Sequence, residues 1–266
     1  MREKILGCMD AVATVGRELE WFENIDSTNT YLKRKALEGA PDGTAVIADY
    51  QTAGRGRMDR TFQSPVGKGI YLSVLLWPDL PPERLLPVTA LAGVAVCNAV
   101  ERVCGVRPGL KWPNDPVLGN RKLCGVLTEL VMDPIRGAAV VLGIGINVLQ
   151  EETDFSPDVA AMATSLAMEL GQPVDRAGLT AALLEELDGM YAALKAGDLS
   201  CWLETYRRDC VNLGRQVRLL AEESAETVTA VDIDAQFGLV IRREDGREET
   251  VRSGEVSVRG LYGYVE

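Results

Sequence analysis

The sequence pattern changes near Asn212, and this change constrains the fold more than any other feature. Before Asn212, apolar stretches with helical spacing alternate with β-prone runs. After it, about 54 residues contain short strand-like runs with turn residues every 8–12 positions. A short, purely β pattern of this kind is typical of a small barrel. We therefore predict an α+β domain over residues 1–211 and a small β domain over residues 212–266.

The first region contains both element types, which favours a β-sheet flanked by helices. Asp26 and Ser27 offer side-chain caps for one helix, and Pro81 and Pro82 can begin another. Strands are predicted at 21–25, 44–50, 69–78, 110–115, 121–132 and 137–148. Helices are predicted at 2–15, 27–38, 81–104, 163–170, 175–196 and 199–210.

Composition excludes several classes of function. The net charge is −11, whereas general nucleic-acid binders are usually basic. Histidine is absent, which excludes Ser–His and Cys–His nucleophile pairs and His-ligated metals. The six cysteines form no C-x-x-C pair, so we expect reduced, mostly buried thiols. The N-terminus has no apolar run typical of a signal peptide or membrane span. We expect a soluble, cytoplasmic protein without a membrane partner.

Positive charge is concentrated in two short runs of this acidic chain. Residues 54–68 and 107–122 each carry a net charge of +3. In the first run, Gly54 and Gly56 alternate with Arg55 and Arg57, so the backbone can approach a ligand closely. Such a loop can surround an anion with backbone N–H groups and guanidinium forks. Charge alone is equally consistent with solvated surface loops.

The common nucleotide-binding motifs are missing. No Walker A pattern occurs, and GIGIN at residues 143–147 has only two of the glycines of a dinucleotide fingerprint. Its glycines are also typical of a strand that bends or that allows a close approach to its backbone. A phosphate-bearing substrate would therefore be bound in another way.

Several short segments in order resemble one family, the biotin protein ligases. They are DSTN (26–29), QTAGRGR (51–57), SP (64–65), KWPND (111–115), RKLCG (121–125), GIN (145–147) and GEVSVRG (254–260). The resemblance implies a mixed β-sheet catalytic domain flanked by helices, of the class II synthetase and biotin ligase type, with a C-terminal SH3-like barrel. About 20 residues precede DSTN, too few for the helix-turn-helix domain of the family's regulatory members. We therefore expect a monofunctional enzyme that does not bind DNA.

The resemblance also implies a two-step reaction. The carboxylate of biotin attacks the α-phosphorus of ATP to give biotinyl-5′-AMP and pyrophosphate, and a carrier lysine then attacks the mixed anhydride. No enzyme nucleophile is needed, which suits a chain without histidine. Catalysis would then depend on positioning the reactants and on stabilising negative charge at phosphorus.

The resemblance assigns roles to individual residues. Lys122 is the expected principal catalytic residue, with Arg55 and Arg57 holding the adenylate. The biotin contacts would be Ser27, Thr28, Asn29, Gln51, Arg55, Gly56, Arg57 and Lys122. The ATP or adenylate contacts would be Lys111, Asn114, Asp115, Asn147 and Arg259, with Asp115 also orienting Mg²⁺.

The binding loop departs from the family pattern after GRGR. Met58 and Asp59 replace a basic stretch, and Phe62 lies near the family's aromatic position. Asp59 places a negative charge beside an anion-binding loop, which bears on how tightly the adenylate is retained. We expect residues 52–66 to become ordered when ligand binds, and Cys124 to be a packing residue.

Two other functions stay open at this point. One is a lipoate or octanoate protein ligase, and the other is a non-catalytic module that senses biotin or its adenylate. For the biotin ligase, the expected partner is a biotin carboxyl carrier domain of a carboxylase, which the sequence does not identify. By analogy with the family, a homodimer could pair the strands near 137–148.

Overall fold

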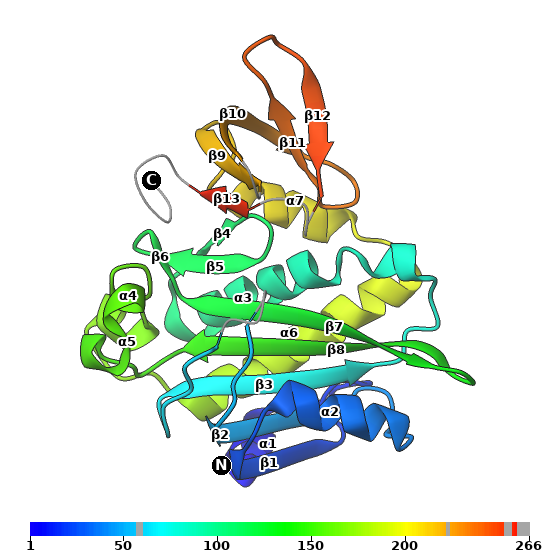
Figure 1. Cartoon of the computed structure of the whole chain (residues 1–266). Coiled ribbons are helices and arrows are strands. Elements are labelled where there is room, and N and C mark those ends of the chain that lie inside the picture. The colour runs from blue at the N-terminus through cyan, green and yellow to red at the C-terminus, as the bar shows by residue number, and fades with distance from the viewer. Residues whose placement is uncertain (57–60, 222–223, 253–256, 260–266) are drawn as a thin grey trace.

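The computed structural model describes residues 1–56, 61–221, 224–252 and 257–259. Its main body is built on a five-stranded sheet in the order β1-β2-β3-β8-β7 (Figure 1). β1 and β2 are parallel, and every other neighbouring pair in this sheet is antiparallel, so the sheet is mixed as predicted. The strands are β1 (Leu19–Ile25), β2 (Ala45–Gln51), β3 (Gly69–Leu76), β7 (Cys124–Asp133) and β8 (Gly137–Asn147).

Helices cover both faces of this sheet. α2 (Thr28–Leu37) packs on one face, where Leu32 and Ala36 meet Val46, Leu75 and Val141. On the other face, α3 (Val88–Cys104) and α6 (Arg176–Ala196) pack against each other. The remaining helices are α1 (Arg2–Cys8), η1 (Pro82–Leu85), η2 (Glu152–Asp154), α4 (Pro157–Ala160), α5 (Leu166–Leu170) and α7 (Ser200–Asp209).

Within the part of the chain that the structure describes, one helical segment, Pro82–Cys104, has the length and apolar composition of a membrane span. In its most apolar window 67% of the residues are buried inside the protein. Its apolar character is therefore explained by packing against α6 and the sheet.

A small three-stranded sheet stands at the end of the main sheet, in the order β4-β5-β6. It consists of β4 (Gly109–Lys111), β5 (Asp115–Leu118) and β6 (Arg121–Lys122), all antiparallel. The second cationic run folds into this sheet, which reverses the chain twice within a few residues.

The C-terminal region forms a five-stranded antiparallel sheet in the order β12-β11-β10-β9-β13. Its strands are β9 (Gln216–Ala221), β10 (Ser224–Ile233), β11 (Leu239–Arg242), β12 (Glu248–Val251) and β13 (Ser257–Arg259). A small β domain is therefore confirmed. Within the described residues its outer strands, β12 and β13, are not paired with each other, so the closed SH3-like barrel and the boundary at residues 211 and 212 stay predictions.

Two predicted helices are shorter than expected. The helix predicted at 2–15 ends at Cys8, because the backbone N–H groups of Ala13, Thr14 and Val15 donate to Asp188 of α6 instead. The helix predicted at 81–104 is split into η1 and α3. Pro87 lies at the break, where it lacks the N–H that would continue a helix.

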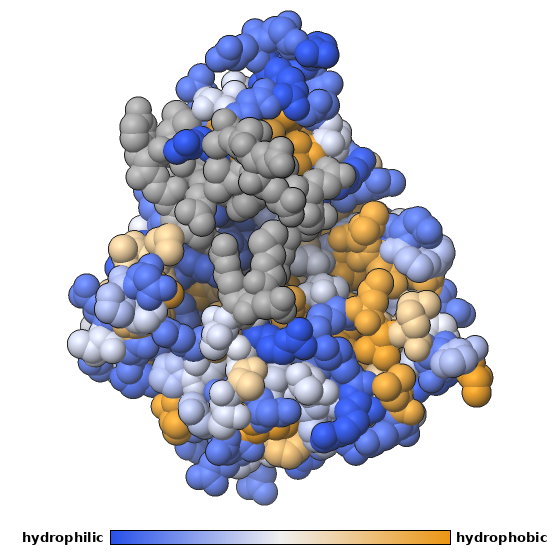
Figure 2. Space-filling view, in the orientation of Figure 1, coloured by the Kyte–Doolittle hydropathy of each residue, from blue (hydrophilic) through white to orange (hydrophobic). Residues whose placement is uncertain are grey.

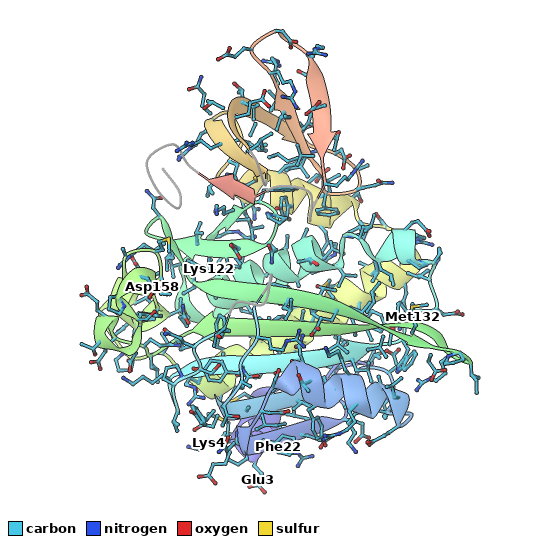
Figure 3. All side chains as sticks on the ribbon, viewed as in Figure 1. Glu3, Lys4, Phe22, Lys122, Met132 and Asp158 are labelled. Atoms are coloured by element: carbon cyan, nitrogen blue, oxygen red, sulfur yellow. The ribbon has the colours of Figure 1, made fainter. Side chains whose placement is uncertain are left out.

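The expected pairing of residues 137–148 across a dimer is wrong. These residues form β8, which is hydrogen-bonded to β3 on one side and to β7 on the other. β1 forms one edge of the sheet, and the edge strand next to β8 is β7, where Leu130 and Met132 are exposed. Figure 2 shows an apolar surface on this side of the molecule, and Figure 3 places Met132 at the far end of β7 from Lys122.

Candidate active site

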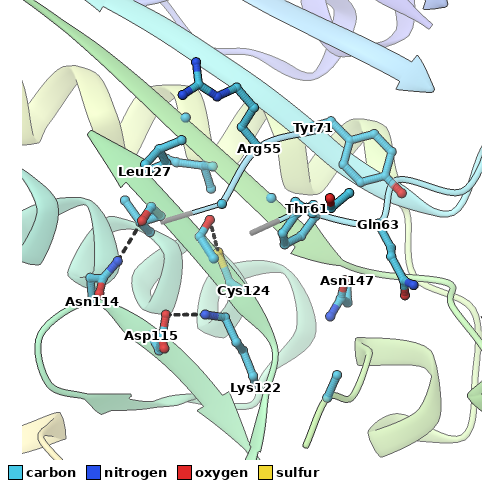
Figure 4. Close-up of a pocket in the computed structure, with 18 of the residues that line it drawn as sticks. Arg55, Thr61, Gln63, Tyr71, Asn114, Asp115, Lys122, Cys124, Leu127 and Asn147 are labelled. Atoms are coloured by element: carbon cyan, nitrogen blue, oxygen red, sulfur yellow. Dashed lines mark hydrogen bonds and ion pairs between the residues drawn. The ribbon is translucent and has the colours of Figure 1, made fainter. Parts of the chain in front are cut away.

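A cavity of about 340 Å³ opens between the glycine-bearing ends of β7 and β8, the small β4–β6 sheet and residues 155–163 (Figure 4). Segments far apart in the sequence contribute to its wall. The predicted site residues that line it are Ser27, Thr28, Asn29, Gln51, Arg55, Gly56, Lys111, Asn114, Asp115, Lys122 and Asn147. The fold therefore brings the two cationic runs and the DSTN segment to one place.

The DSTN segment forms the start of α2 and also one wall of the cavity. Ser27 is the N-cap, and its Oγ accepts from the Thr30 backbone N–H at 3.4 Å. The backbone N–H of Thr28 donates to Gln51 Oε1 at 2.9 Å, which ties the helix to the end of β2. The capping role and the cavity-lining role thus coexist in the same residues.

A buried polar network continues behind this wall. The Ser73 hydroxyl lies 2.6 Å from Asn29 Oδ1 and 2.7 Å from Thr28 Oγ1. The amide of Gln51 uses its other end to donate to Ser64 Oγ at 3.0 Å. The cavity therefore has a preformed set of hydroxyl and amide groups at this end.

Glycines leave the backbone of β7 and β8 bare at the cavity floor. Gly125 and Gly145 are directly paired across the two strands. A Cβ on Gly143 would lie 2.2 Å from Asn29 Oδ1, and a Cβ on Gly145 would lie 2.5 Å from Phe62 Cζ. The glycines of GIGIN thus allow a close approach to the backbone, which was one of the two readings of that motif.

Phe62 lies over this floor, and the sequence analysis gave it no site role. Its ring stands over Gly125 and Gly145 and meets the Tyr71 ring edge-on at 6.3 Å between centroids. Its backbone N–H donates to the carbonyl of Gly54, which closes the binding loop on itself. The loop therefore places an aromatic ring inside the cavity.

Lys122 is held on the opposite wall, in β6. Its ammonium lies 2.6 Å from Asp115 Oδ1, with a third of the side chain exposed (Figure 4). Its backbone N–H donates to Met162 at 2.7 Å, and its carbonyl accepts from Thr164. These bonds join Lys122 to the segment at residues 155–163, which forms a third, apolar wall of the cavity.

Asn114 and Asn147 line the cavity but already bind backbone groups. Asn114 Nδ2 donates to the Val126 carbonyl at 2.7 Å. Asn147 Nδ2 donates to the Thr164 carbonyl at 3.0 Å, while its Oδ1 accepts from Gln150. Both amides therefore hold the walls of the cavity in place, in addition to any contact with a ligand.

Charge at the cavity is mainly positive. Arg55, Lys111 and Lys122 line it together with the carboxylate of Asp115, and Lys111 is only 5% exposed. Cys124 also lines the cavity, but complete burial raises its pKa well above the usual range of a thiol. The thiol is thus neutral at physiological pH, as expected of a packing residue.

The third wall is apolar, and sequence analysis did not predict it. It consists of Phe155, Val159, Met162 and Ala163. Two contacts attach this segment to the binding loop and the residues after it: Ser156 N–H donates to Gln63 Oε1, and Lys68 pairs with Asp154 at 2.5 Å. An acidic loop with scattered apolar residues gave no pattern from which a ligand wall could be predicted.

Two predicted site residues cannot be placed. Arg57 lies outside the described residues, as do Met58 and Asp59. The side chain of Arg259 lies outside them as well, although its backbone is part of β13 and pairs with Arg218. Their roles stay predictions.

Comparisons with known proteins agree with this geometry. Residues 21–147 match the Biotin/lipoate A/B protein ligase family, and residues 213–259 match the Biotin protein ligase C terminal domain. A biotin--[acetyl-CoA-carboxylase] ligase of Mycobacterium tuberculosis is 34% identical over 96% of this chain and 93% of that protein. The bifunctional ligase/repressor BirA of Bacillus spizizenii is 34% identical over 87% of this chain and 71% of that protein.

Solved structures show the same likeness. The biotin protein ligase of Aquifex aeolicus in complex with biotin and ATP superposes with a TM-score of 0.81 at 32% identity. The match covers 92% of this chain and 99% of the Aquifex chain. The family models, the Mycobacterium relative and the Aquifex structure thus agree, and the chain belongs to the biotin protein ligase family.

Proposed function

We propose that this chain activates biotin with ATP to biotinyl-5′-AMP and transfers the biotinyl group to a lysine of a biotin carboxyl carrier domain. One observation carries the proposal: one cavity joins a polar wall, a glycine floor partly covered by Phe62, Lys122 and an apolar wall. The polar wall suits the ureido ring of biotin, and the floor suits its acyl chain. Lys122 suits the two reacting anions, and the apolar wall suits the adenine base.

The biotin ring fits the end of the cavity formed by α2 and β2. A ureido group carries N–H donors and a carbonyl acceptor, so hydroxyl and amide groups are suitable partners. Ser27, Thr28, Asn29 and Gln51 supply these groups. Gly143 and Gly145 leave room for the Asn29 amide and the Phe62 ring to lie against the sheet at this end of the cavity. Binding there directs the carboxylate of biotin toward Lys122.

Lys122 is the residue that would assist the first step. Biotin's carboxylate and the α-phosphate of ATP are both negative, so their approach is opposed by repulsion. An ammonium between them reduces that repulsion and stabilises the charge that builds up at phosphorus. A carboxylate oxygen forms the new bond to phosphorus while the bond from phosphorus to the pyrophosphate oxygen breaks. Asp115 orients the Lys122 ammonium in the absence of ligand.

The adenine base fits the apolar wall of Phe155, Val159, Met162 and Ala163, because a planar base gains from leaving water. Lys111, almost fully buried at the cavity, is placed to neutralise phosphate charge. Arg55 and Arg57 of the binding loop, and Arg259 of the C-terminal sheet, are proposed to hold the adenylate and keep water away from it.

Mg²⁺ fits this site only as a companion of the nucleotide. Among the described residues, no group of three or more Asp, Glu, His or Cys side chains could hold a metal alone. Mg²⁺ commonly binds through substrate phosphates and one or two carboxylates, and Asp115 is the carboxylate at the cavity. Bound there, the ion would neutralise phosphate charge, and Asp115 would orient it directly or through water.

In the second step, the amine of the carrier lysine attacks the acyl carbon of the adenylate. A new amide bond forms and AMP leaves with the former anhydride oxygen, so no covalent bond to the enzyme is required. The proposed partner is a carrier domain of a biotin-dependent carboxylase. A cytoplasmic setting agrees with six free cysteines, and an acidic chain with a net charge of −11 does not favour DNA as a partner. A homodimer stays a prediction, with the exposed edge strand β7 as its candidate contact.

The main alternative is a lipoate or octanoate ligase, since the matched family model covers both biotin and lipoate enzymes. The matched C-terminal domain of biotin protein ligases favours biotin. Exchange of labelled pyrophosphate into ATP separates the alternatives. We expect exchange that requires biotin. Exchange that requires lipoate or octanoate would instead support the alternative, and no exchange with any acid would support a non-catalytic sensing module.

A further inference from the structure

Glu129 lies at the edge of the cavity and belongs to none of the motifs of the sequence analysis. It is in β7, where alternate residues share a face of the sheet. Gly125 and Leu127 line the cavity, so Glu129 follows them on the same face. Its side chain is 19% exposed. A half-buried acid beside a site for an anionic substrate needs a physical explanation.

The carboxylate of Glu129 has three partners from two different parts of the wall. Asn29 Nδ2 donates to Oε2 at 2.9 Å, and the Lys33 ammonium donates to Oε1 at 2.7 Å. The Arg55 guanidinium lies 3.4 Å from Oε1. Glu129 thus connects the start of α2, which carries Asn29 and Lys33, to the binding loop, which carries Arg55.

The contact with Asn29 fixes which way its amide points. Asn29 Oδ1 accepts from the Ser73 hydroxyl, so Nδ2 must be the atom that meets Glu129. An amide bonded at both ends cannot flip without breaking two hydrogen bonds. The second N–H of Nδ2 is then held in a defined direction at the cavity wall.

The contact with Arg55 anchors a loop residue whose side chain is 41% exposed. An exposed arginine loses much rotamer freedom when it binds a ligand, and an existing ion pair lowers that entropic cost. The two cations also compensate the charge of the acid. Burial raises the pKa of Glu129, but hydrogen bonds from Lys33 and Asn29 and the charges of Lys33 and Arg55 lower it more, so the group stays ionised.

We propose that Glu129 is a positioning residue for the biotin subsite, which sets the Asn29 amide and the Arg55 guanidinium together before biotin binds. This inference depends on the proposed function. Lys33 offers the matched control, since it also binds Glu129 but does not line the cavity among the described residues. A purely structural ion pair would respond equally to loss of either partner.

The test measures steady-state kinetics of adenylation for the wild type, Glu129→Gln and Lys33→Met. We expect Glu129→Gln to raise the KM for biotin about tenfold, the factor for one charge-assisted hydrogen bond, with the KM for ATP changed less than about twofold. Lys33→Met should leave the KM for biotin within about twofold. In an Arg55→Ala background, Glu129→Gln should raise this KM by a smaller factor, because one shared partner is already gone.

Glu129→Asp keeps the charge and shortens the side chain, so its KM for biotin should lie between those of the wild type and Glu129→Gln. The inference is wrong if Glu129→Gln binds biotin like the wild type, or if Lys33→Met raises the KM for biotin equally. Wild-type protein without biotin-dependent exchange would overturn the proposed function itself, which is a separate result.

Discussion

Arg107 and Lys122 stand at the two ends of one cationic run, yet the structure uses them differently. Arg107 binds the Asp209 carboxylate at 2.5 Å, with Glu101 and Asn98 as further partners, and lies away from the cavity. Lys122 lines the cavity, where its ammonium meets Asp115. The residues between them form β4, β5 and the first residue of β6, which separate the two ends in space.

The first cationic run shows the same division. Lys68 binds Asp154 and holds the segment that forms the apolar wall, whereas Arg55 lines the cavity. A basic run in a sequence is therefore a mixture of groups that fix the wall and groups that face a ligand. Variants of the groups that face a ligand should lose activity, whereas variants of the groups that fix the wall should lose stability.

The largest effect is expected for Lys122→Ala. Loss of a preorganised charge near the α-phosphate should lower the adenylation rate at least about 100-fold, measured by biotin-dependent pyrophosphate exchange. The matched control is Arg107→Ala, which should lower the melting temperature but keep the rate within about twofold. Near-wild-type exchange by Lys122→Ala would remove this lysine from its proposed role.

The next largest effect on adenylation is expected for Gly145→Ala, because the added Cβ would lie 2.5 Å from the Phe62 ring. The ring must shift over the cavity floor, and overpacking typically costs about 1–3 kcal/mol. Because this contact lies where substrate is proposed to bind, we expect the adenylation rate to fall roughly tenfold. Gly189→Ala in α6 is the control, since its added Cβ would meet no heavy atom within 4 Å beyond its chain neighbours and the adjacent backbone of its own helix. Unchanged kinetics in Gly145→Ala would show that the floor is not used by substrate.

Asp209→Asn tests the charged groups that stabilise the fold and lie away from the cavity. Its carboxylate is 6% exposed and pairs with Arg107 and Arg208. Among the described residues, Arg107 would then keep only Glu101 as an ionic partner, so the free energy of unfolding should fall by about 3 kcal/mol at neutral pH, measured by denaturant titration. The adenylation rate per folded molecule should not change.

The stability difference between wild type and Asp209→Asn should depend on pH, because the carboxyl group of Asp209 titrates. Burial raises the pKa of Asp209, but hydrogen bonds from Arg107 and Arg208 and their charges lower it more, so the folded value is below the usual one. The stability difference between wild type and Asp209→Asn should be complete above about pH 4 and should shrink as the pH falls through the folded pKa. A difference that grows on acidification would contradict the assignment.

The smallest effect is expected for Cys124→Ala. The thiol lies at the cavity, but it is buried and neutral. Its removal should leave the adenylation rate within about twofold, because no covalent intermediate on the enzyme is proposed. A large loss of rate, at an unchanged melting temperature, would point to a nucleophilic role instead.

Local patterns predicted most elements of the fold. The β-prone runs predicted β7 and β8 within a few residues, and the cap at Ser27 predicted the start of α2. The predictions failed where a distant group binds the backbone, as Asp188 does at residues 13–15, beyond the end of α1.

The site was predictable only in its motif residues. The DSTN, GRGR and RKLCG segments resembled a known family, and their described residues meet at one cavity. Phe62, Glu129 and the apolar wall at 155–163 act through neighbours far away in the sequence. No local pattern encodes such contacts, because they arise only when the sheet has formed.

The most direct measurement is mass analysis of the small molecule that the protein retains after incubation with biotin and ATP. If biotin's carboxylate reacts directly with ATP in the cavity, without a covalent bond to the enzyme, the released species is biotinyl-5′-AMP and the protein mass is unchanged. Recovery of unreacted biotin and ATP alone, or a protein heavier by one biotinyl or adenylyl group, would contradict this account.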